Sequence, residues 1–201
     1  MAAVLEARDL AGERAGRLVF EGVSFCLGPG EALVLIGVNG AGKTSLLRVL
    51  AGLGRIAGGV LSWQGEPVAQ DPLAHAARVA LLGHADALKP QLTVFETLRH
   101  EARIRGGSAG EAMAATGLES LAESPVRILS AGQRRRVALA RLALGARPLW
   151  LLDEPTVALD SAGVATLARL VSAHRTRGGL VVASSHLDLP IEGAQTLRLA
   201  A

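Results

Sequence analysis

A run of eight residues, rich in glycine and ending in Lys43-Thr44, constrains this chain of 201 residues more than any other feature of its sequence. The run fits the pattern G-x-x-x-x-G-K-[ST] in full. An apolar stretch of strand length precedes it at residues 33–36, and residues 45–50 follow with apolar positions at helical spacing. Strand, loop and helix in this order predict a phosphate-binding loop, made of residues Gly37, Val38, Asn39, Gly40, Ala41, Gly42, Lys43, Thr44 and Ser45.

The residue types of this loop suit the binding of a nucleoside triphosphate. Glycines let backbone N–H groups converge on phosphate oxygens, and the N-terminus of the following helix adds the positive end of its dipole. Lys43 can bridge the β- and γ-phosphates, and Thr44 can give its hydroxyl to Mg²⁺. The alternative is a glycine-rich turn with an incidental lysine, which the flanking strand and helix disfavour.

Two adjacent carboxylates end a second apolar stretch, at residues 149–152. Asp153 would hold the shell of the Mg²⁺ ion, and Glu154 would polarise the attacking water. An Asp-Glu pair after a strand is by itself more often a solvated turn. In a chain that also carries a phosphate-binding loop, the catalytic interpretation is favoured.

The order of the remaining elements predicts an α/β fold in one domain. Residues 4–10 and 17–27 read as two strands separated by Gly12 and Gly16, and further strands are expected at 59–63, 79–82 and 180–183. A helical stretch near 164–175 between two buried strands gives the order βαβ, which implies parallel central strands. Capping boxes at Thr93 and Ser108 predict helix starts, so residues 86–135 read as a helical insertion.

Composition excludes several classes of protein. No stretch approaches the roughly 18 to 20 apolar residues of a membrane-spanning helix, and the N-terminus lacks an export signal, so a cytoplasmic location is expected. Cys26, the only cysteine, is expected in the core. The pI of about 9.9 comes from arginines scattered among acidic residues, which does not indicate a nucleic-acid partner.

Residues 129–133, Leu-Ser-Ala-Gly-Gln, resemble the LSGGQ signature of the ATP-binding cassette (ABC) family, with Ala131 in place of the first glycine. Ser130, Gly132 and Gln133 would begin a helix whose N-terminus can meet a phosphate, although taken alone they read only as a helix cap. The resemblance implies a P-loop NTPase fold of the ABC type. This fold has a mixed central sheet, an N-terminal antiparallel β subdomain and a short helical subdomain.

Three smaller pieces extend the resemblance to the ABC family. Pro155 follows the acidic pair, Asp160 stands in the D-loop position, and His186 follows a strand as the switch histidine does. The resemblance implies that ATP is bound between Walker A of one copy and the signature of a second copy. It also implies catalytic contacts from His186 to the γ-phosphate and to Glu154.

Residues 61–67, 82–84 and 129–142 narrow the resemblance to the ATP-binding subunits of bacterial haem exporters in cytochrome c maturation. This implies an ATPase on the cytoplasmic face of the inner membrane that contacts the membrane only through integral membrane partners. Three alternatives stay open at this point. They are another compact ABC transporter, an ABC ATPase that remodels DNA or ribosomes, and a silent nucleotide-gated scaffold.

Two positions depart from the family pattern. His84 stands where most cassettes have the glutamine that reaches the Mg²⁺ and the attacking water, and a neutral imidazole nitrogen could replace the amide oxygen as acceptor. No aromatic residue lies between residues 10 and 16, where one normally stacks on adenine. Arg14 is the nearest planar group there and is the candidate for that contact.

Overall fold

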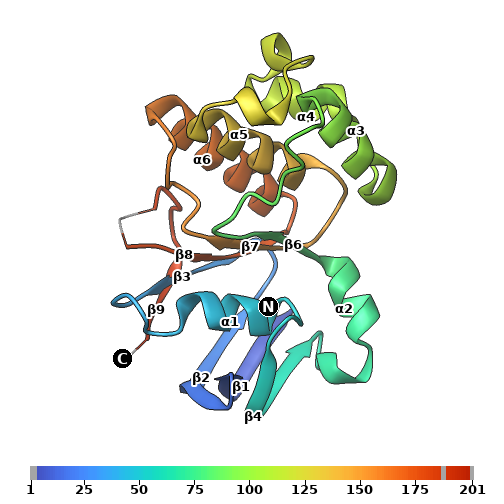
Figure 1. Cartoon of the computed structure of the whole chain (residues 1–201). Coiled ribbons are helices and arrows are strands. Elements are labelled where there is room, and N and C mark those ends of the chain that lie inside the picture. The colour runs from blue at the N-terminus through green and yellow to red at the C-terminus, as the bar shows by residue number, and fades with distance from the viewer. Residues whose placement is uncertain (1–3, 187–188, 200–201) are drawn as a thin grey trace. The chain divides into compact units, whose positions relative to one another are not determined.

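A computed structural model describes residues 4–186 and 189–199 and divides the chain into two compact units (Figure 1). The first unit comprises Met1–Leu81, Arg147–Glu154 and His174–Ala201, and the second comprises Leu82–Ala146 and Pro155–Ala173. Each unit has an apolar cluster of its own. Among the described residues no helix is long and apolar enough to cross a membrane.

The first unit contains an antiparallel sheet in the order β2-β1-β4-β5. Its strands are β1 (Leu5–Arg14), β2 (Arg17–Leu27), β4 (Arg55–Trp63) and β5 (Glu66–Pro67). The turn between β1 and β2 uses positive φ angles at Ala15 and Gly16, of 50° and 76°, as a tight hairpin requires. The two N-terminal strands predicted from the sequence are therefore confirmed: β2 has the predicted bounds, and β1 extends four residues beyond the predicted end at residue 10.

Two residues of this sheet differ from the sequence-based expectation. Gly12 does not interrupt β1, because the strand continues to Arg14 and a Cβ at Gly12 would lie 2.3 Å from the Phe20 ring. The glycine thus makes room for an aromatic side chain on the neighbouring strand. The prediction of a core position for Cys26 was wrong, since this residue of β2 is exposed.

The first unit also contains a five-stranded sheet in the order β6-β7-β8-β3-β9. Its strands are β6 (Val79–Leu82), β7 (Leu149–Asp153), β8 (Leu180–Ser184), β3 (Ala32–Ile36) and β9 (Gln195–Arg198). The pairs β7–β8, β8–β3 and β3–β9 are parallel. Parallel and antiparallel pairing are thus both present, as the family resemblance implied, but they occur in two separate sheets.

Helices of the first unit are α1 (Lys43–Leu50) and α2 (Pro72–Arg78), with the 3₁₀ turn η1 at Val68–Gln70. In Figure 1, α1 leaves the end of β3 and runs beside the sheets, and it contacts β1, β7 and β8. The carboxyl ends of parallel strands meet at one edge of a sheet. The loops that follow β3, β7 and β8 therefore come together, and they carry the residues described below.

The second unit is built from helices. They are α3 (Val94–Arg105), α4 (Ala109–Thr116), α5 (Ala131–Ala140) and α6 (Ser161–Thr176, of which the last three residues belong to the first unit), with 3₁₀ turns η2 (Glu119–Leu121), η3 (Val126–Ile128) and η4 (Arg141–Ala143). The predicted capping box at α3 has both bonds, from the Glu96 N–H to Thr93 and from the Thr93 N–H to Glu96. At α4, Ser108 accepts the Glu111 N–H.

Candidate functional site

The loop between β3 and α1 depends on glycines for its path. Gly37, Gly40 and Gly42 have φ angles of 153°, 87° and 92°, which residues with a Cβ rarely adopt. A Cβ at Gly42 would also lie 2.6 Å from the Val19 carbonyl oxygen, and one at Gly37 would lie 2.8 Å from that of Leu199. The backbone of this loop is therefore packed against its own unit on one side.

Helix α1 begins directly at this loop and leaves its first turn open to an anion. Its N-cap residue is Gly42, which provides no side chain to accept the N–H groups of the first turn. No acidic residue lies in that turn. Such an N-terminus offers N–H donors and the positive end of the helix dipole together. On the loop side, Val38, Asn39 and Gly40 are exposed.

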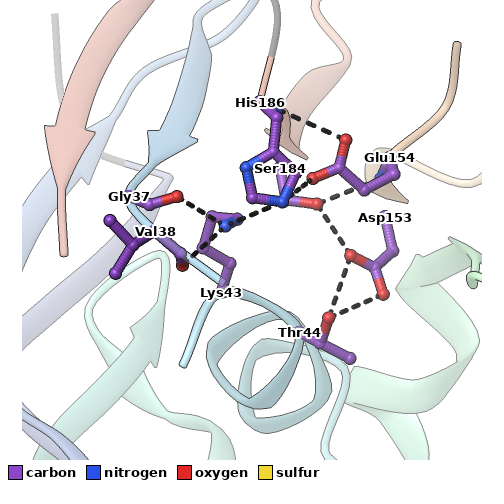
Figure 2. Close-up of polar contacts among 8 residues, drawn as sticks. All are labelled: Gly37, Val38, Lys43, Thr44, Asp153, Glu154, Ser184 and His186. Atoms are coloured by element: carbon purple, nitrogen blue, oxygen red, sulfur yellow. Dashed lines mark hydrogen bonds and ion pairs between the residues drawn. The ribbon is translucent and has the colours of Figure 1, made fainter. Parts of the chain in front are cut away.

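Lys43 is the charged group at this helix start, and its side chain is only 7% exposed (Figure 2). Its Nζ donates to the carbonyl oxygens of Gly37 at 2.7 Å and Val38 at 3.1 Å. The Nε2 of His186 lies 3.3 Å from the same Nζ. A buried ammonium group needs such partners. The loop carbonyls thus hold the charge at the point where the loop meets the helix.

Thr44 and Asp153 form a pair of oxygen ligands beside Lys43. The Thr44 hydroxyl donates to the Asp153 carboxylate, at 2.9 Å from Oδ2 and 3.1 Å from Oδ1. Ser184 also donates to Asp153 Oδ1, at 2.7 Å, from the end of β8. Asp153 is 4% exposed. A carboxylate with a neighbouring hydroxyl is a ligand set that Mg²⁺ accepts, so these residues fit that ion.

Glu154 follows β7 in a strained backbone conformation that sets the direction of its side chain. Its φ is 46°, in the left-handed region, which costs a residue with a side chain on the order of 1 to 3 kcal/mol. The turn is held because the Glu154 N–H donates to the Ser184 hydroxyl at 3.0 Å. The Glu154 carboxylate accepts the backbone N–H of His186 at 3.4 Å, and its Oε1 lies 3.2 Å from the His186 Nε2.

The second unit contains the other predicted group of site residues. At the start of α5, the Ser130 hydroxyl accepts the Gln133 N–H at 3.2 Å, and Gln133 Oε1 accepts the Ser130 N–H at 2.8 Å. Gly132 lies close to the loop before α6, since a Cβ there would be 2.9 Å from the Ala158 carbonyl oxygen. The signature residues thus form a complete capping box.

Asp160 lies in the same unit and caps α6. Its Oδ1 accepts the Gly163 N–H at 2.8 Å, and its Oδ2 pairs with Arg136 Nη2 at 2.7 Å. The pKa of Asp160 lies below its usual value, chiefly because of the bond from Gly163 and further because of the Arg136 charge. A carboxylate at a helix start is thus kept ionised beside the signature helix.

Arg14 and His84 lie outside both groups. Arg14 ends β1 opposite Arg17, and His84 is exposed in the loop after β6. A cavity of about 360 Å³ in the first unit is lined by β2 and β9, and Arg14 is not among its lining residues, which are Leu18, Val19, Phe20, Glu21, Gly22, Val23, Leu197, Arg198 and Leu199. The structure therefore gives no contact that supports the expected role of Arg14.

Comparison with known proteins gives the family. Residues 20–157 match the ABC transporter family. This chain belongs to that family. It is 52% identical to the cytochrome c biogenesis ATP-binding export protein CcmA of Paramagnetospirillum magneticum, over 96% of this chain and 92% of the relative. It is 49% identical to the protein of the same name from Paracoccus denitrificans, over 98% of this chain and 89% of the relative.

Solved structures agree with the ABC fold. A structure described as the ATP binding subunit of an ABC transporter is 29% identical, with a TM-score of 0.81 over 92% of this chain and 80% of that one. A putative ABC transporter ATP-binding protein from Pyrococcus furiosus is 24% identical, with a TM-score of 0.83 over 97% of this chain and 96% of that one, which shows the fold alone. The family and fold class predicted from the sequence are confirmed. As a member of the ABC family, this chain is an ATP-binding ATPase.

Ser184 is a residue of the ABC site that the sequence analysis missed. It is fully buried, and its hydroxyl joins the two acidic residues, since it donates to Asp153 and accepts from the Glu154 N–H. A serine at the end of the apolar run Leu-Val-Val-Ala was the available signal. A buried hydroxyl at the carboxyl end of a parallel strand has to find a partner at the ligand edge of the sheet.

Proposed function

We propose that this chain is the ATP-hydrolysing subunit of a membrane-bound ABC exporter that serves cytochrome c biogenesis, most specifically haem export. The relatives are named as ATP-binding export proteins of cytochrome c biogenesis, which supports the export role, and they match this chain at about 50% identity over almost its whole length. The single observation that carries the ATPase mechanism is the cluster of Lys43, Thr44, Asp153, Glu154 and His186 in one unit (Figure 2).

In this proposal the loop and α1 bind the phosphates of ATP. The backbone N–H groups from Gly40 to Ser45 would donate to the phosphate oxygens. Lys43 would leave its loop carbonyl partners and bind the β- and γ-phosphates. Thr44 and Asp153 hold Mg²⁺, whose charge would neutralise the charge that develops on the phosphates. Ser184 keeps the Asp153 carboxylate oriented through its 2.7 Å bond.

Glu154 is proposed as the group that orients and polarises the attacking water. Its strained turn fixes the carboxylate beside His186, and a fixed acceptor contributes more to a transition state than a mobile one does. His186 would hold Glu154 on one side and reach the γ-phosphate on the other. Arg14 is proposed to cover the adenine face, and His84 is proposed to replace the usual glutamine as an acceptor near the metal.

A second copy of the chain completes this site. Ser130, Gly132 and Gln133 of one copy would meet the ATP bound by the other, and Asp160 would lie at the same junction. The chain is proposed to be one ATPase domain, with residues 86–135 as its helical subdomain. It would work at the cytoplasmic face of the bacterial inner membrane, bound to integral membrane subunits and without a nucleic-acid partner.

The test is purification of the tagged full chain from detergent-solubilised membranes of its own cells. We expect multi-spanning membrane proteins to co-purify, and cells without the chain to lose covalent haem staining of their c-type cytochromes. A plasmid with the parent chain should restore the staining, while Glu154→Gln should assemble with the same partners and not restore it. Normal cytochromes in the deletion strain, or isolation with ribosomes or DNA instead of membrane proteins, would contradict the proposal.

A further inference from the structure

A buried arginine of α5 contacts the loop that carries His84. Arg135 is 3% exposed and lies in the second turn of the signature helix. Its Nη1 donates to the Gly83 carbonyl oxygen at 2.9 Å and to Asp86 Oδ1 at 3.1 Å. Gly83 and Asp86 lie on either side of His84 in the sequence. The loop around His84 is therefore fixed to the helix that begins after Ser130.

The same guanidinium group contacts a second segment. Arg135 Nε donates to the Pro155 carbonyl oxygen at the longer distance of 3.4 Å. Pro155 directly follows Glu154 along the chain and begins the segment that leads to Asp160. One buried side chain thus contacts two segments of the second unit, and each segment contains or directly follows a residue of the proposed catalytic mechanism, His84 or Glu154.

Arg141 adds a second attachment to the same loop. Its Nη1 donates to the Asp86 carbonyl oxygen at 2.9 Å, and its Nη2 pairs with Glu101 Oε1 at 2.9 Å. Asp86 is therefore held through its side chain by Arg135 and through its backbone by Arg141. With the bond at Gly83, residues 83–86 have three attachment points on two arginines that are six positions apart in sequence.

The chemistry of the guanidinium group explains why an arginine is needed at position 135. It presents five N–H donors in a rigid planar fork and stays charged, so one buried group can bind carbonyl and carboxylate partners in several directions. A lysine has one charged nitrogen on a flexible stem and cannot span the same partners. Burial of such a charge is compatible with folding only when it is paired and hydrogen-bonded, as it is here.

We propose that Arg135 is a positioning residue for ATP hydrolysis, which ties the loop of His84 and the segment after Glu154 to the signature helix. Nucleotide contacts at the start of α5 would then reach His84 and Glu154 through one rigid side chain. The proposal rests on the proposed function, because it assigns these segments to ATP hydrolysis. It predicts a loss of turnover without a loss of ATP binding.

Hydrogen exchange on the full chain tests the attachment itself. In Arg135→Lys, the amides of residues 83–90 should exchange at least about tenfold faster than in the parent, because bonds to a charged donor are lost. Amides of β7 and α4 should keep their parent rates. Arg169→Lys is the matched control, since the exposed Arg169 also donates to a backbone carbonyl, that of Ala115, and its loss should leave residues 83–90 unchanged. Equal exchange of residues 83–90 in Arg135→Lys and the parent would overturn the proposal.

Steady-state kinetics on the same variants, each purified from detergent-solubilised membranes with its membrane partners, test the consequence for catalysis. We expect kcat to fall about tenfold or more in Arg135→Lys and in Asp86→Asn, with the ATP dissociation constant within about twofold of the parent. Asp86→Asn keeps the test decisive if an Arg135 variant does not fold. Weaker ATP binding with unchanged kcat would overturn the positioning role. A parent that stays inactive in its membrane complex contradicts the proposed function itself, whereas an active parent complex with an equally active Arg135→Lys complex contradicts only the role of Arg135.

Discussion

The starts of α1 and α5 are two helix N-termini that the sequence assigns to one ligand, but they are built in opposite ways. At α1 the N-cap is Gly42, which contributes no cap side chain. At α5 the N-cap is Ser130, and a full capping box joins it to Gln133. The first helix therefore keeps its N–H donors available to a phosphate. The second uses its own side chains to satisfy two of its N–H groups.

This difference indicates that the free-energy cost of binding a phosphate differs between the two helix starts. A phosphate at α1 gains donors that have no competing side chain. A phosphate at α5 has to share or replace bonds already made by Ser130 and Gln133, each on the order of 1 kcal/mol. We therefore expect a single chain to bind ATP through α1, and α5 to contribute only when a second copy presents it.

The largest expected effect is that of Glu154→Gln on turnover. It sharpens the comparison because it separates ATP binding at the start of α1 from ATP hydrolysis. Glu154→Gln should reduce kcat by about 10² to 10⁴, since an amide cannot polarise water as a carboxylate does. ATP affinity should stay close to that of the parent. Turnover and calorimetric ATP binding measured on the same preparation check both halves, and near-normal hydrolysis would remove Glu154 from the mechanism.

The next largest effect is the loss of ATP binding at the start of α1. Lys43→Ala should raise the ATP dissociation constant by about 100-fold or more, because the triphosphate loses its buried charged donor. Lys89 is the other lysine of the chain and is exposed, so Lys89→Ala is a matched control that should bind as the parent does. Isothermal titration calorimetry of both variants is the measurement. Equal affinities in the two would contradict the assignment of the loop.

A smaller effect concerns two glycines of the loop before α1, of which Gly42 is the N-cap residue of the helix. Gly42→Ala should destabilise the fold by about 1 to 3 kcal/mol, since φ is 92° and the new Cβ would meet the Val19 carbonyl oxygen. Gly40→Ala has a similar φ of 87° but no atom within 4 Å of the added Cβ, so it should cost less. Urea unfolding of the two variants separates the cost of the contact from that of backbone strain. Equal losses in the free energy of unfolding would mean that the backbone shifts and removes the contact with Val19.

The smallest effect tests the capped helix. Ser130→Ala removes the acceptor of the Gln133 N–H and should lower the free energy of unfolding by about 1 kcal/mol. At the same time, ATP affinity of the single chain should not change. Ser108→Ala, which removes a similar bond at α4, is the control for the loss of a cap. A Ser130 variant with clearly weaker ATP binding as a single chain would show that the α5 start binds nucleotide without a second copy.

Much of this molecule follows from local patterns in the sequence. The run from Gly37 to Thr44 predicts the phosphate-binding loop because the positive φ angles and the lysine are needed within a few residues of each other. The strands at 79–82 and 180–183 and the capping box at Thr93 were also predictable, since apolar runs and caps act over one element. Asp153 and Glu154 could be predicted as site residues because they end an apolar strand in a chain that also carries a phosphate-binding loop.

Tertiary structure decided the features that depend on partners far along the chain. Ser184 joins Asp153 and Glu154 only because β7 and β8 pair in register, and Arg135 has its hydrogen-bond partners only because α5 lies beside the loop at 83–86. Gly12 continues its strand because Phe20 lies opposite it, and Cys26 is exposed because of the face that β2 turns to solvent. Sequence determined the local conformations and the chemistry available. Long-range pairing and packing determined which of those groups meet, because register and burial depend on the whole unit and not on neighbouring residues.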